Sequence, residues 1–304
     1  MPIKHNYLQV EGINIHYVEA QAPDPKGTLL FFHGFPEYWA TWHAQLDYFS
    51  ANYRVIAVDL PGYNLSDKPQ NTEFFRLGNL IQFMAKFVQS VVATEKVYLI
   101  AHDWGGAIAW PLAAFYPQLF EKLIIINAAH PSLFTREMIH NSLQRQKSEY
   151  IHKLIADDAV KRLSGNNFAY LRNIAFAGMR PGTLSAAQKL AYQQAWSQPG
   201  AVNGMLQYYR AMPQLGGSSK AESASAGPVT STSQMKIPHI RINVPTLILW
   251  GEQDQAFVLE NTQGIEEYVA DCQVKRFSHA SHWLQHELPN EVNHEIAGFI
   301  GPLN

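Results

Sequence analysis

The stretch Ile100-Ala101-His102-Asp103-Trp104-Gly105-Gly106 decides which fold this chain is expected to adopt. It joins an apolar run at 97–101, typical of a buried strand, to an apolar helical segment at 107–115. A sharp turn from strand to helix needs small residues two positions before and two positions after its central residue. Ala101 and Gly105 meet that need, so the pattern predicts a nucleophile elbow with Asp103 at its tip.

A carboxylate at the tip of the elbow determines which substrates the site can attack. If a serine attacked an alkyl carbon, the product would be an ether, which no enzymatic base could readily hydrolyse. Asp103 would instead form an ester, and water can cleave an ester at its carbonyl carbon. Electrophilic sp³ carbons with a leaving group, as in epoxides and alkyl halides, are therefore the expected substrates. The alternative role for Asp103 is to cap the helix at 107–115.

Short apolar runs recur on both sides of the elbow. Residues 8–10 and 13–18 alternate apolar and polar side chains, as in a half-buried hairpin. Further runs, continuous enough for strands buried on both faces, lie at 28–32, 54–58, 97–101, 123–126, 245–250 and 274–277. Helix-length stretches separate these runs, and 75–93 follows a helical period. The alternation predicts an α/β fold, a mostly parallel central sheet flanked by helices.

The alternation stops after residue 127, and a second, helical unit is expected there. Residues 137–212 have helical patterning, with helices expected at 150–163, 186–196 and 201–212. They are expected to cover the carboxyl edge of the sheet, where open α/β sheets bind ligands. The Ser-, Gly- and Ala-rich stretch 216–233 is typical of a flexible linker or surface loop. The predicted division is an α/β core of 1–128 and 239–304, an inserted helical cap of 129–215 and a linker at 216–238.

A second turn, Phe31-Phe32-His33-Gly34-Phe35-Pro36-Glu37, ends the strand expected at 28–32. An oxyanion hole needs two amide donors, and backbone amides at such a turn can point into a pocket. The expected pair is the amide of Phe35 and the amide of Trp104, the residue after the nucleophile. His33 is expected to be a structural, hydrogen-bonded residue. The pocket lining is expected to include the rest of this turn, namely His33, Gly34 and Pro36.

A general base must deprotonate the hydrolytic water, and the segment after the last expected strand offers His279 and His282. Spacing favours His282 over His279. An acid that orients the imidazole is expected between nucleophile and base along the chain. In Trp250-Gly251-Glu252-Gln253-Asp254 that acid is Asp254, with Glu252 as its competitor.

The composition excludes several classes of protein. With 47% hydrophobic and 16% charged residues, the 304-residue chain is globular rather than disordered. Its 23 basic and 25 acidic residues give a net charge of −2, so nucleic acid and anionic membrane surfaces are not expected partners. The single Cys272, the absence of an apolar signal core at the start and the lack of a long apolar run make the cytoplasm the default compartment.

No cofactor is expected. The chain has no His-x-x-x-His pair beside a carboxylate on an expected helix and no cysteine pair, so no metal site is predicted. No Gly-x-Gly-x-x-Gly or Walker sequence follows an expected strand, so no nucleotide is predicted either. The sequence leaves the oligomeric state open, with a homodimer as one candidate.

Together these motifs resemble those of the soluble-type epoxide hydrolases, enzymes of the α/β-hydrolase superfamily with an aspartate nucleophile. The resemblance covers most of the chain and rests on the turn at 33–37, on Asp59-Leu60-Pro61-Gly62-Tyr63-Asn64-Leu65-Ser66-Asp67-Lys68-Pro69 and on the elbow. The family's Ser-His-Trp-x-x-x-Glu-x-Pro stretch matches 281–289, which favours His282, and its Gly-Glu-x-Asp acid matches 251–254. The resemblance implies cofactor-independent conversion of a small-molecule epoxide to a vicinal diol.

The resemblance also implies two cap tyrosines, whose hydroxyls hold the epoxide oxygen and donate a proton as the ring opens. Tyr209, directly before an arginine, occupies one of these positions. Tyr150 aligns with the other, although Leu154-Ile155-Ala156-Asp157-Asp158 replaces the family's Phe-Gln-x-Pro stretch. A related branch, the virulence inhibitory factors, can take its acid from after the sixth strand, but Asn127-Ala128-Ala129-His130 offers no carboxylate. Apart from the resemblance, Tyr150, Tyr208 and Tyr209 also fit an aromatic core stripe.

Two other functions stay open at this point. A dehalogenase could use the same fold and the same nucleophile. Fluoroacetate dehalogenases, however, carry arginines directly after the nucleophile, where this chain has Trp104, Gly105 and Gly106, and haloalkane dehalogenases often have Asn in place of Phe35. A non-catalytic binding protein could also have kept the fold and its pocket, because fold does not imply function.

Overall fold

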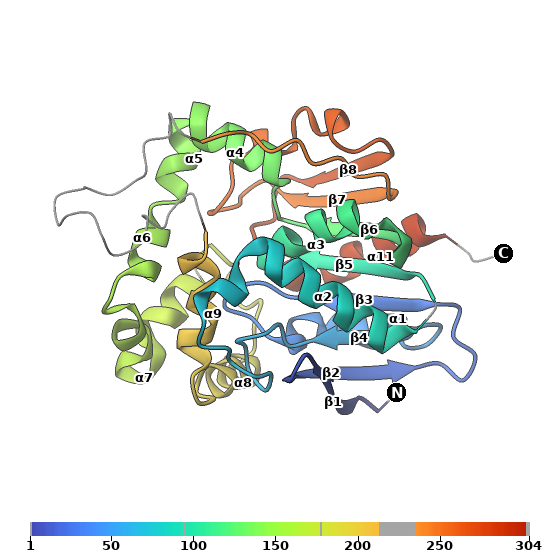
Figure 1. Cartoon of the computed structure of the whole chain (residues 1–304), viewed down its shortest axis with the longest axis horizontal. Helices are drawn as coiled ribbons and strands as arrows, with labels where there is room; N and C mark the ends of the chain where they lie inside the picture. The colour runs from blue at the N-terminus through green and yellow to red at the C-terminus, as the bar shows by residue number, and fades with distance from the viewer. Residues whose placement is uncertain (1, 94, 177, 213–234, 302–304) are drawn as a thin grey trace.

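The computed structural model describes residues 2–93, 95–176, 178–212 and 235–301 (Figure 1). Within these ranges one eight-stranded sheet has the strand order β1-β2-β4-β3-β5-β6-β7-β8. The strands are β1 (Lys4–Val10), β2 (Ile13–Gln21), β3 (Thr28–Phe32), β4 (Arg54–Val58), β5 (Val97–His102), β6 (Phe120–Ile126), β7 (Thr246–Gly251) and β8 (Cys272–Phe277).

Most of the sheet is parallel. β1 pairs antiparallel with β2, and β2 pairs antiparallel with β4, whereas all pairs from β4 to β8 are parallel. The predicted hairpin, the predicted strands and the α/β class are therefore confirmed.

Alternate residues of the central strands enter two different cores. In β3, Leu30 and Phe32 pack in the core that includes α2 (Leu77–Val92) and α3 (Trp104–Phe115). Their neighbours Leu29 and Phe31 pack in the core that includes α1 (His43–Phe49) and α11 (Pro289–Ile300). Successive side chains of a strand point to opposite faces, so a continuous apolar run fits a strand covered on both sides. Each fully buried Leu or Phe contributes roughly 1.5–3 kcal/mol relative to an exposed one.

Between β6 and β7 the described residues form six helices, which we call the inserted helices. They are α4 (Pro131–His140), α5 (Ser142–Lys147), α6 (Tyr150–Ile155), α7 (Ala159–Ala175), α8 (Ala186–Trp196) and α9 (Ala201–Arg210). The parallel strands run toward this group, which lies beyond their carboxyl ends at the left of Figure 1. The short helix α10 (Leu284–Glu287) and 3₁₀ turns complete the described structure, the turns being η1 (Trp39–Trp42), η2 (Thr72–Phe75), η3 (Pro117–Leu119), η5 (Leu259–Thr262) and η6 (Ile265–Glu267).

The predicted helix at 150–163 is wrong in one respect, because the chain breaks it into α6 and α7. Ala156 has an extended backbone, with φ −62° and ψ 151°, and ends α6. Asp158 flanks the start of α7, and its carboxylate accepts two hydrogen bonds from Arg162 one turn later. Aspartates are poor interior helix residues and favour helix starts, so Asp157 and Asp158 carried a signal for this break.

Two more predicted helices are present, whereas the predicted domain division is not tested by the structure. The helices expected at 186–196 and 201–212 form as α8 and α9. The Ser-rich stretch 216–233 lies outside the described residues, and the division into core, cap and linker stays a prediction. Within the described ranges, none of the helices combines the length and the apolar character needed to cross a membrane.

Candidate active site

The predicted elbow is present between β5 and α3. Asp103 has φ 50° and ψ −118°, a positive φ that is uncommon outside glycine and marks backbone strain. At Gly105 and Gly106 the elbow lies too close to its neighbours for a larger residue. A Cβ would lie 2.4 Å from the Phe32 oxygen at Gly105 and 2.3 Å from the Ala128 Cβ at Gly106. The Asp103 side chain makes no capping hydrogen bond to α3, so its alternative role as a helix cap is not supported.

The turn after β3 meets the nucleophile from the other side. The Phe35 amide donates to Asp103 Oδ1 at 2.6 Å, as expected for one donor of the oxyanion hole. Gly34 must be small, because a Cβ there would lie 2.3 Å from the Cβ of Asp103. The Phe35–Pro36 peptide is cis, and the Trp196 indole N–H donates to the Pro36 carbonyl at 2.6 Å.

The remaining turn residues have different surroundings. Trp104 is the first residue of α3, so its amide has no intrahelical acceptor and remains the candidate second donor. His33 is buried, with Nδ1 2.9 Å from the Gly34 carbonyl and Nε2 accepting the Leu60 amide at 3.0 Å. Both ring nitrogens of His33 are therefore hydrogen-bonded to backbone groups, in agreement with the structural role expected for it.

His282 and Asp254 come together with the nucleophile. His282 Nε2 lies 3.7 Å from Asp103 Oδ2, and its Nδ1 lies 2.8 Å from Asp254 Oδ2. The competing residues are placed elsewhere: His279 is exposed, and Glu252 pairs with Arg276 at 3.6 Å. The geometry thus favours His282 over His279 as the partner of Asp103, and Asp254 over Glu252 as the partner of His282.

Asp254 is buried and held by three donors besides the histidine. The amides of Ala256 and Phe257 donate to its Oδ1 at 2.6 and 2.9 Å, and Asn127 Nδ2 donates to its Oδ2 at 2.7 Å. Burial alone would raise the pKa of Asp254, but His282 and these donors hold it below its usual value. The role of Asn127 was not predicted from the sequence, because only a carboxylate was expected to act from the segment after β6 and Asn127 contributes an amide.

The charges around His282 set its protonation. Burial alone would lower the pKa of His282, but the carboxylate of Asp254 and the weaker influence of Asp103 raise it to about 9. The imidazole is therefore protonated at neutral pH.

The two predicted tyrosines face the nucleophile from the inserted helices. Tyr150 begins α6, Tyr209 lies in α9, and their ring centroids are 6.4 Å apart. Tyr209 also packs edge-on against Phe35 and Trp104, at 5.1 Å from each ring. Burial raises the pKa of both tyrosines, so both hydroxyls keep their protons.

Tyr208 has a different role from its neighbour. It is buried, and its hydroxyl donates to the Pro61 carbonyl at 2.8 Å. The aromatic-stripe interpretation therefore fits Tyr208, whose hydroxyl is occupied by the backbone although the residue lines one cavity beside Asp103; Tyr209 lines both cavities there.

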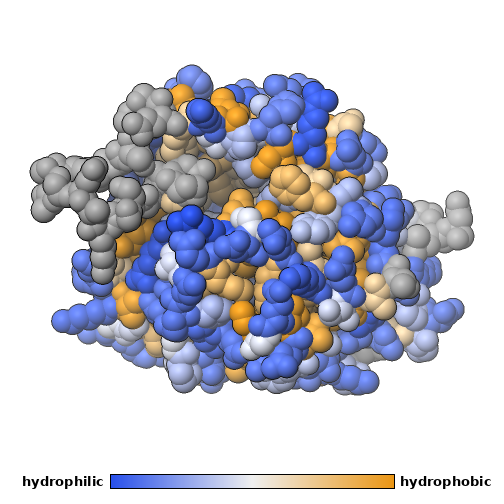
Figure 2. All heavy atoms as spheres, in the orientation of Figure 1, coloured by the Kyte–Doolittle hydropathy of each residue, from blue (hydrophilic) through white to orange (hydrophobic). Residues whose placement is uncertain are grey.

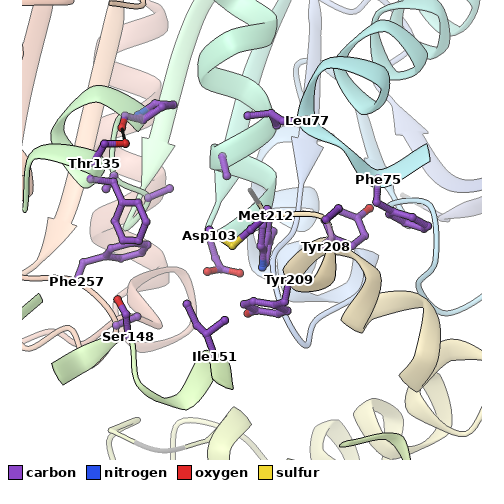
Figure 3. Close-up of a pocket in the computed structure, with 18 of the residues that line it drawn as sticks. Phe75, Leu77, Asp103, Thr135, Ser148, Ile151, Tyr208, Tyr209, Met212 and Phe257 are labelled. Atoms are coloured by element: carbon purple, nitrogen blue, oxygen red, sulfur yellow. Dashed lines mark hydrogen bonds between the residues drawn. The ribbon is translucent and has the colours of Figure 1, made fainter. Parts of the chain in front are cut away.

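Two cavities meet at Asp103. The larger chamber holds about 230 Å³, and its wall includes apolar residues from η2, the start of α2, α6 and the segments after α9 and β7, namely Phe75, Leu77, Ile151, Met212 and Phe257 (Figure 3). Figure 2 shows apolar side chains around a hollow on this face, between α2 and α4. The smaller chamber holds about 200 Å³ and reaches His282. Both chambers border Asp103, Ala256, Tyr150 and Tyr209.

A buried polar cluster lies behind His282. His102 Nε2 lies 2.9 Å from the His282 carbonyl and must donate to it, because a carbonyl oxygen only accepts. Its Nδ1 lies 2.8 Å from Glu37 Oε2, and the other oxygen of Glu37 lies 3.1 Å from His286 Nε2. Burial alone would raise the pKa of Glu37, but the two histidines hold it well below its usual value. Glu37 and His102 belong to the turn and elbow motifs of the sequence, but the contact between them was not predicted.

Among residues 2–93, 95–176, 178–212 and 235–301, no cluster of three or more His, Cys, Asp or Glu side chains is arranged to hold a metal ion.

Comparison with known proteins agrees with this geometry. The family model described as alpha/beta hydrolase fold matches residues 27–289. Epoxide hydrolase 4 of Mus musculus is 33% identical to this chain, in an alignment that covers 97% of this chain and 79% of that protein. The crystal structure of Bacillus megaterium epoxide hydrolase in complex with an inhibitor is 34% identical, with a TM-score of 0.84 over 97% of this chain and 99% of that one. Potato epoxide hydrolase I, from Solanum tuberosum, is 25% identical, with a TM-score of 0.79 over 98% and 99% of the two chains.

The fold and the family match together show that this is a protein of the alpha/beta hydrolase fold. Its similarity to the mouse and bacterial proteins extends over nearly the whole chain. The chain therefore belongs to the epoxide hydrolases, which confirms the family that its sequence motifs resemble.

Proposed function

We propose that this enzyme hydrolyses epoxides in two half-reactions that share a covalent ester on Asp103. The observation that carries the proposal is the line of Asp103, His282 and Asp254, with contacts of 3.7 and 2.8 Å, facing Tyr150 and Tyr209 in one site. A carboxylate nucleophile, a base with its orienting acid and two phenols are the groups that this chemistry needs.

The first half-reaction opens the ring. Because Oδ1 of Asp103 accepts the Phe35 amide, Oδ2 is the oxygen that attacks a ring carbon. The new ester C–O bond forms while the C–O bond of the epoxide breaks. The released alkoxide is more basic than a phenolate, so it takes a proton from Tyr150 or Tyr209. The proton of His282 then replaces the one that the tyrosine gave.

The second half-reaction cleaves the ester. Ester formation removes the negative charge of Asp103, one of the charges that raise the pKa of His282, so the imidazole loses its proton more readily than in the free enzyme. The neutral imidazole takes a proton from water as the oxygen of that water adds to the ester carbonyl carbon. Negative charge develops on Oδ1, where the amides of Phe35 and Trp104 stabilise it.

Collapse of this tetrahedral intermediate releases the diol. The departing oxygen takes the proton held by His282, and the carboxylic acid of Asp103 returns its proton to the imidazole. The site is then back in its starting state, and the net reaction is epoxide plus water to vicinal diol.

The walls of the two chambers favour epoxides with apolar substituents. In the larger chamber, the hydroxyl of Thr135 bonds the Pro131 carbonyl and that of Ser148 accepts from Gln144, so neither needs a ligand partner. The predicted cap and the cytoplasmic location remain predictions from the sequence that accompany this proposal.

The His282→Gln variant tests the proposal, because it should stall the second half-reaction. After exposure to a panel of epoxides and haloalkanes, its intact mass should increase by the mass of a whole epoxide, and peptide mapping should find the adduct on Asp103. The double variant His282→Gln, Asp103→Asn is the control and should gain no mass.

The other outcomes of this experiment are equally informative. An increase equal to a haloalkane minus hydrogen halide, without any epoxide adduct, would indicate a dehalogenase. A diol formed by the variant at the wild-type rate would contradict the role given to His282.

A further inference from the structure

Gln144 of α5 is buried and makes four hydrogen bonds with its side-chain amide. Its Oε1 accepts the Val258 amide at 3.1 Å and Asn261 Nδ2 at 2.8 Å. Its Nε2 donates to the Ala256 carbonyl at 2.9 Å and to Ser148 Oγ at 3.1 Å. Both lone pairs of the oxygen and both hydrogens of the nitrogen are thus used, which fixes the orientation of the amide.

One side of this amide holds the turn that binds the orienting acid. Gln144 bonds the carbonyl of Ala256 and the amide of Val258, and between these two groups lies the amide of Phe257. The amides of Ala256 and Phe257 are the pair that donates to Asp254 Oδ1. Gln144 therefore fixes the backbone from which Asp254 receives two of its donors.

The other side of the amide holds the segment that carries a catalytic tyrosine. Ser148 closes α5, where its amide bonds the Gln144 carbonyl at 3.0 Å. Its own carbonyl accepts the Ile151 amide at 3.1 Å, across the start of α6. Tyr150 lies within that turn, so its backbone is connected to Gln144 through Ser148.

We propose that Gln144 is a positioning residue for both half-reactions, placing Tyr150 for ring opening and Asp254, and through it His282, for ester hydrolysis. This inference rests on the proposed function. Gln144 does not line either chamber, so it acts through the residues that it holds. It also ties the inserted helix α5 to the loop after β7, which links the two parts of the site.

A hydrocarbon in this position would leave the groups at 256, 258 and 261 without their partner. A buried polar group that loses its partner destabilises the folded loop, and the loop can reduce this cost by moving toward water. Displacement of catalytic groups by about 1 Å can lower a rate by as much as about 100-fold. We therefore expect Gln144→Leu to slow both half-reactions by at least about tenfold.

Gln45→Leu is the matched control. Gln45 is a fully buried glutamine of α1, on the other side of the sheet, and neither of its amide atoms has a hydrogen-bond partner among the described residues. Its replacement should leave both rates and their pH dependence at wild-type values, although it removes the same buried amide.

Single-turnover kinetics with styrene oxide, used as an apolar probe epoxide, separates the two steps. Rapid quenching followed by intact-mass analysis gives the rates of ester formation and ester hydrolysis for wild type, Gln144→Leu and Gln45→Leu. The pH at which hydrolysis reaches half its maximal rate should be lower in Gln144→Leu, because a less well held Asp254 raises the pKa of His282 by less. Destabilisation without repositioning would not move this pH.

Two further variants separate the effect of Gln144 on Tyr150 from its effect on Asp254. Neither variant depends on whether Gln144→Leu folds. Ser148→Ala should slow ester formation and leave hydrolysis unchanged, whereas Asn261→Leu should slow hydrolysis and leave ester formation unchanged. Wild-type rates and pH dependence in folded Gln144→Leu, or equal losses in Gln45→Leu, would overturn the inference. If wild type itself forms no ester with any epoxide tested, the proposed function fails instead.

Discussion

Replacement of His282 by glutamine should change how the stability of this enzyme depends on pH. Burial alone would lower the pKa of His282, but Asp254 at 2.8 Å and Asp103 at 3.7 Å bring it to about 9 in the folded chain, against 6.5 for a free histidine. The folded state therefore binds this proton more tightly than the unfolded state, and protonation stabilises the fold.

The size and the pH range of the effect follow from these two values. A difference of one pKa unit corresponds to about 1.4 kcal/mol, so the interval from 6.5 to about 9 corresponds to roughly 3 kcal/mol. Because the folded pKa is the higher one, this contribution is fully present below pH 6.5 and disappears as the pH rises through 9.

Urea unfolding at intervals from pH 6 to pH 10 measures the effect in wild type and in His282→Gln. The difference in unfolding free energy between the two proteins should shrink by roughly 3 kcal/mol across that range. His279→Gln is the control, because His279 is exposed, and it should keep the wild-type pH dependence. Parallel curves for wild type and His282→Gln would refute the charge assignment around His282.

Three more predictions concern the nucleophile and the chambers. Tyr209→Phe should slow ester formation from epoxides by about 100-fold and leave ester hydrolysis unchanged, as single-turnover kinetics would show. Gly34→Ala should abolish ester formation, because its Cβ would overlap the nucleophile, whereas Gly78→Ala, which meets nothing within 4 Å, should keep full activity and gain roughly 0.5–1 kcal/mol in urea unfolding. Met212→Trp should lower kcat/KM for epoxides with one bulky substituent, and Ile174→Trp should lower it more for epoxides substituted on both carbons, since each residue lines one chamber.

Local patterns were sufficient to predict the elements of the sheet and the elbow that carries Asp103. The continuous apolar run at 97–101 and the small residues around Asp103 are signals carried by neighbouring positions, and the structure contains the strand and the elbow that they predict. The break between α6 and α7 was missed because helical periodicity at 150–163 outweighed two consecutive aspartates.

The supporting contacts could not be predicted in the same way. Asn127 and Asp254 are 127 positions apart, and Glu37 and His102 are 65 positions apart. Gln144 reaches Asn261 across 117 positions. No local pattern encodes such pairs, because each depends on how the loops at the carboxyl ends of separate strands approach one another in the folded chain.

The crowding around the elbow limits where the substrate range of this enzyme can change. Gly34, Gly105 and Gly106 have no room for even one more carbon, so variation at these positions would displace the nucleophile. Much of the wall of the two chambers instead consists of side chains on the inserted helices, such as Ile151 and Ile174. Evolution or protein engineering can therefore alter which epoxide is accepted from one side of the site, while the backbone of the sheet preserves the reaction itself.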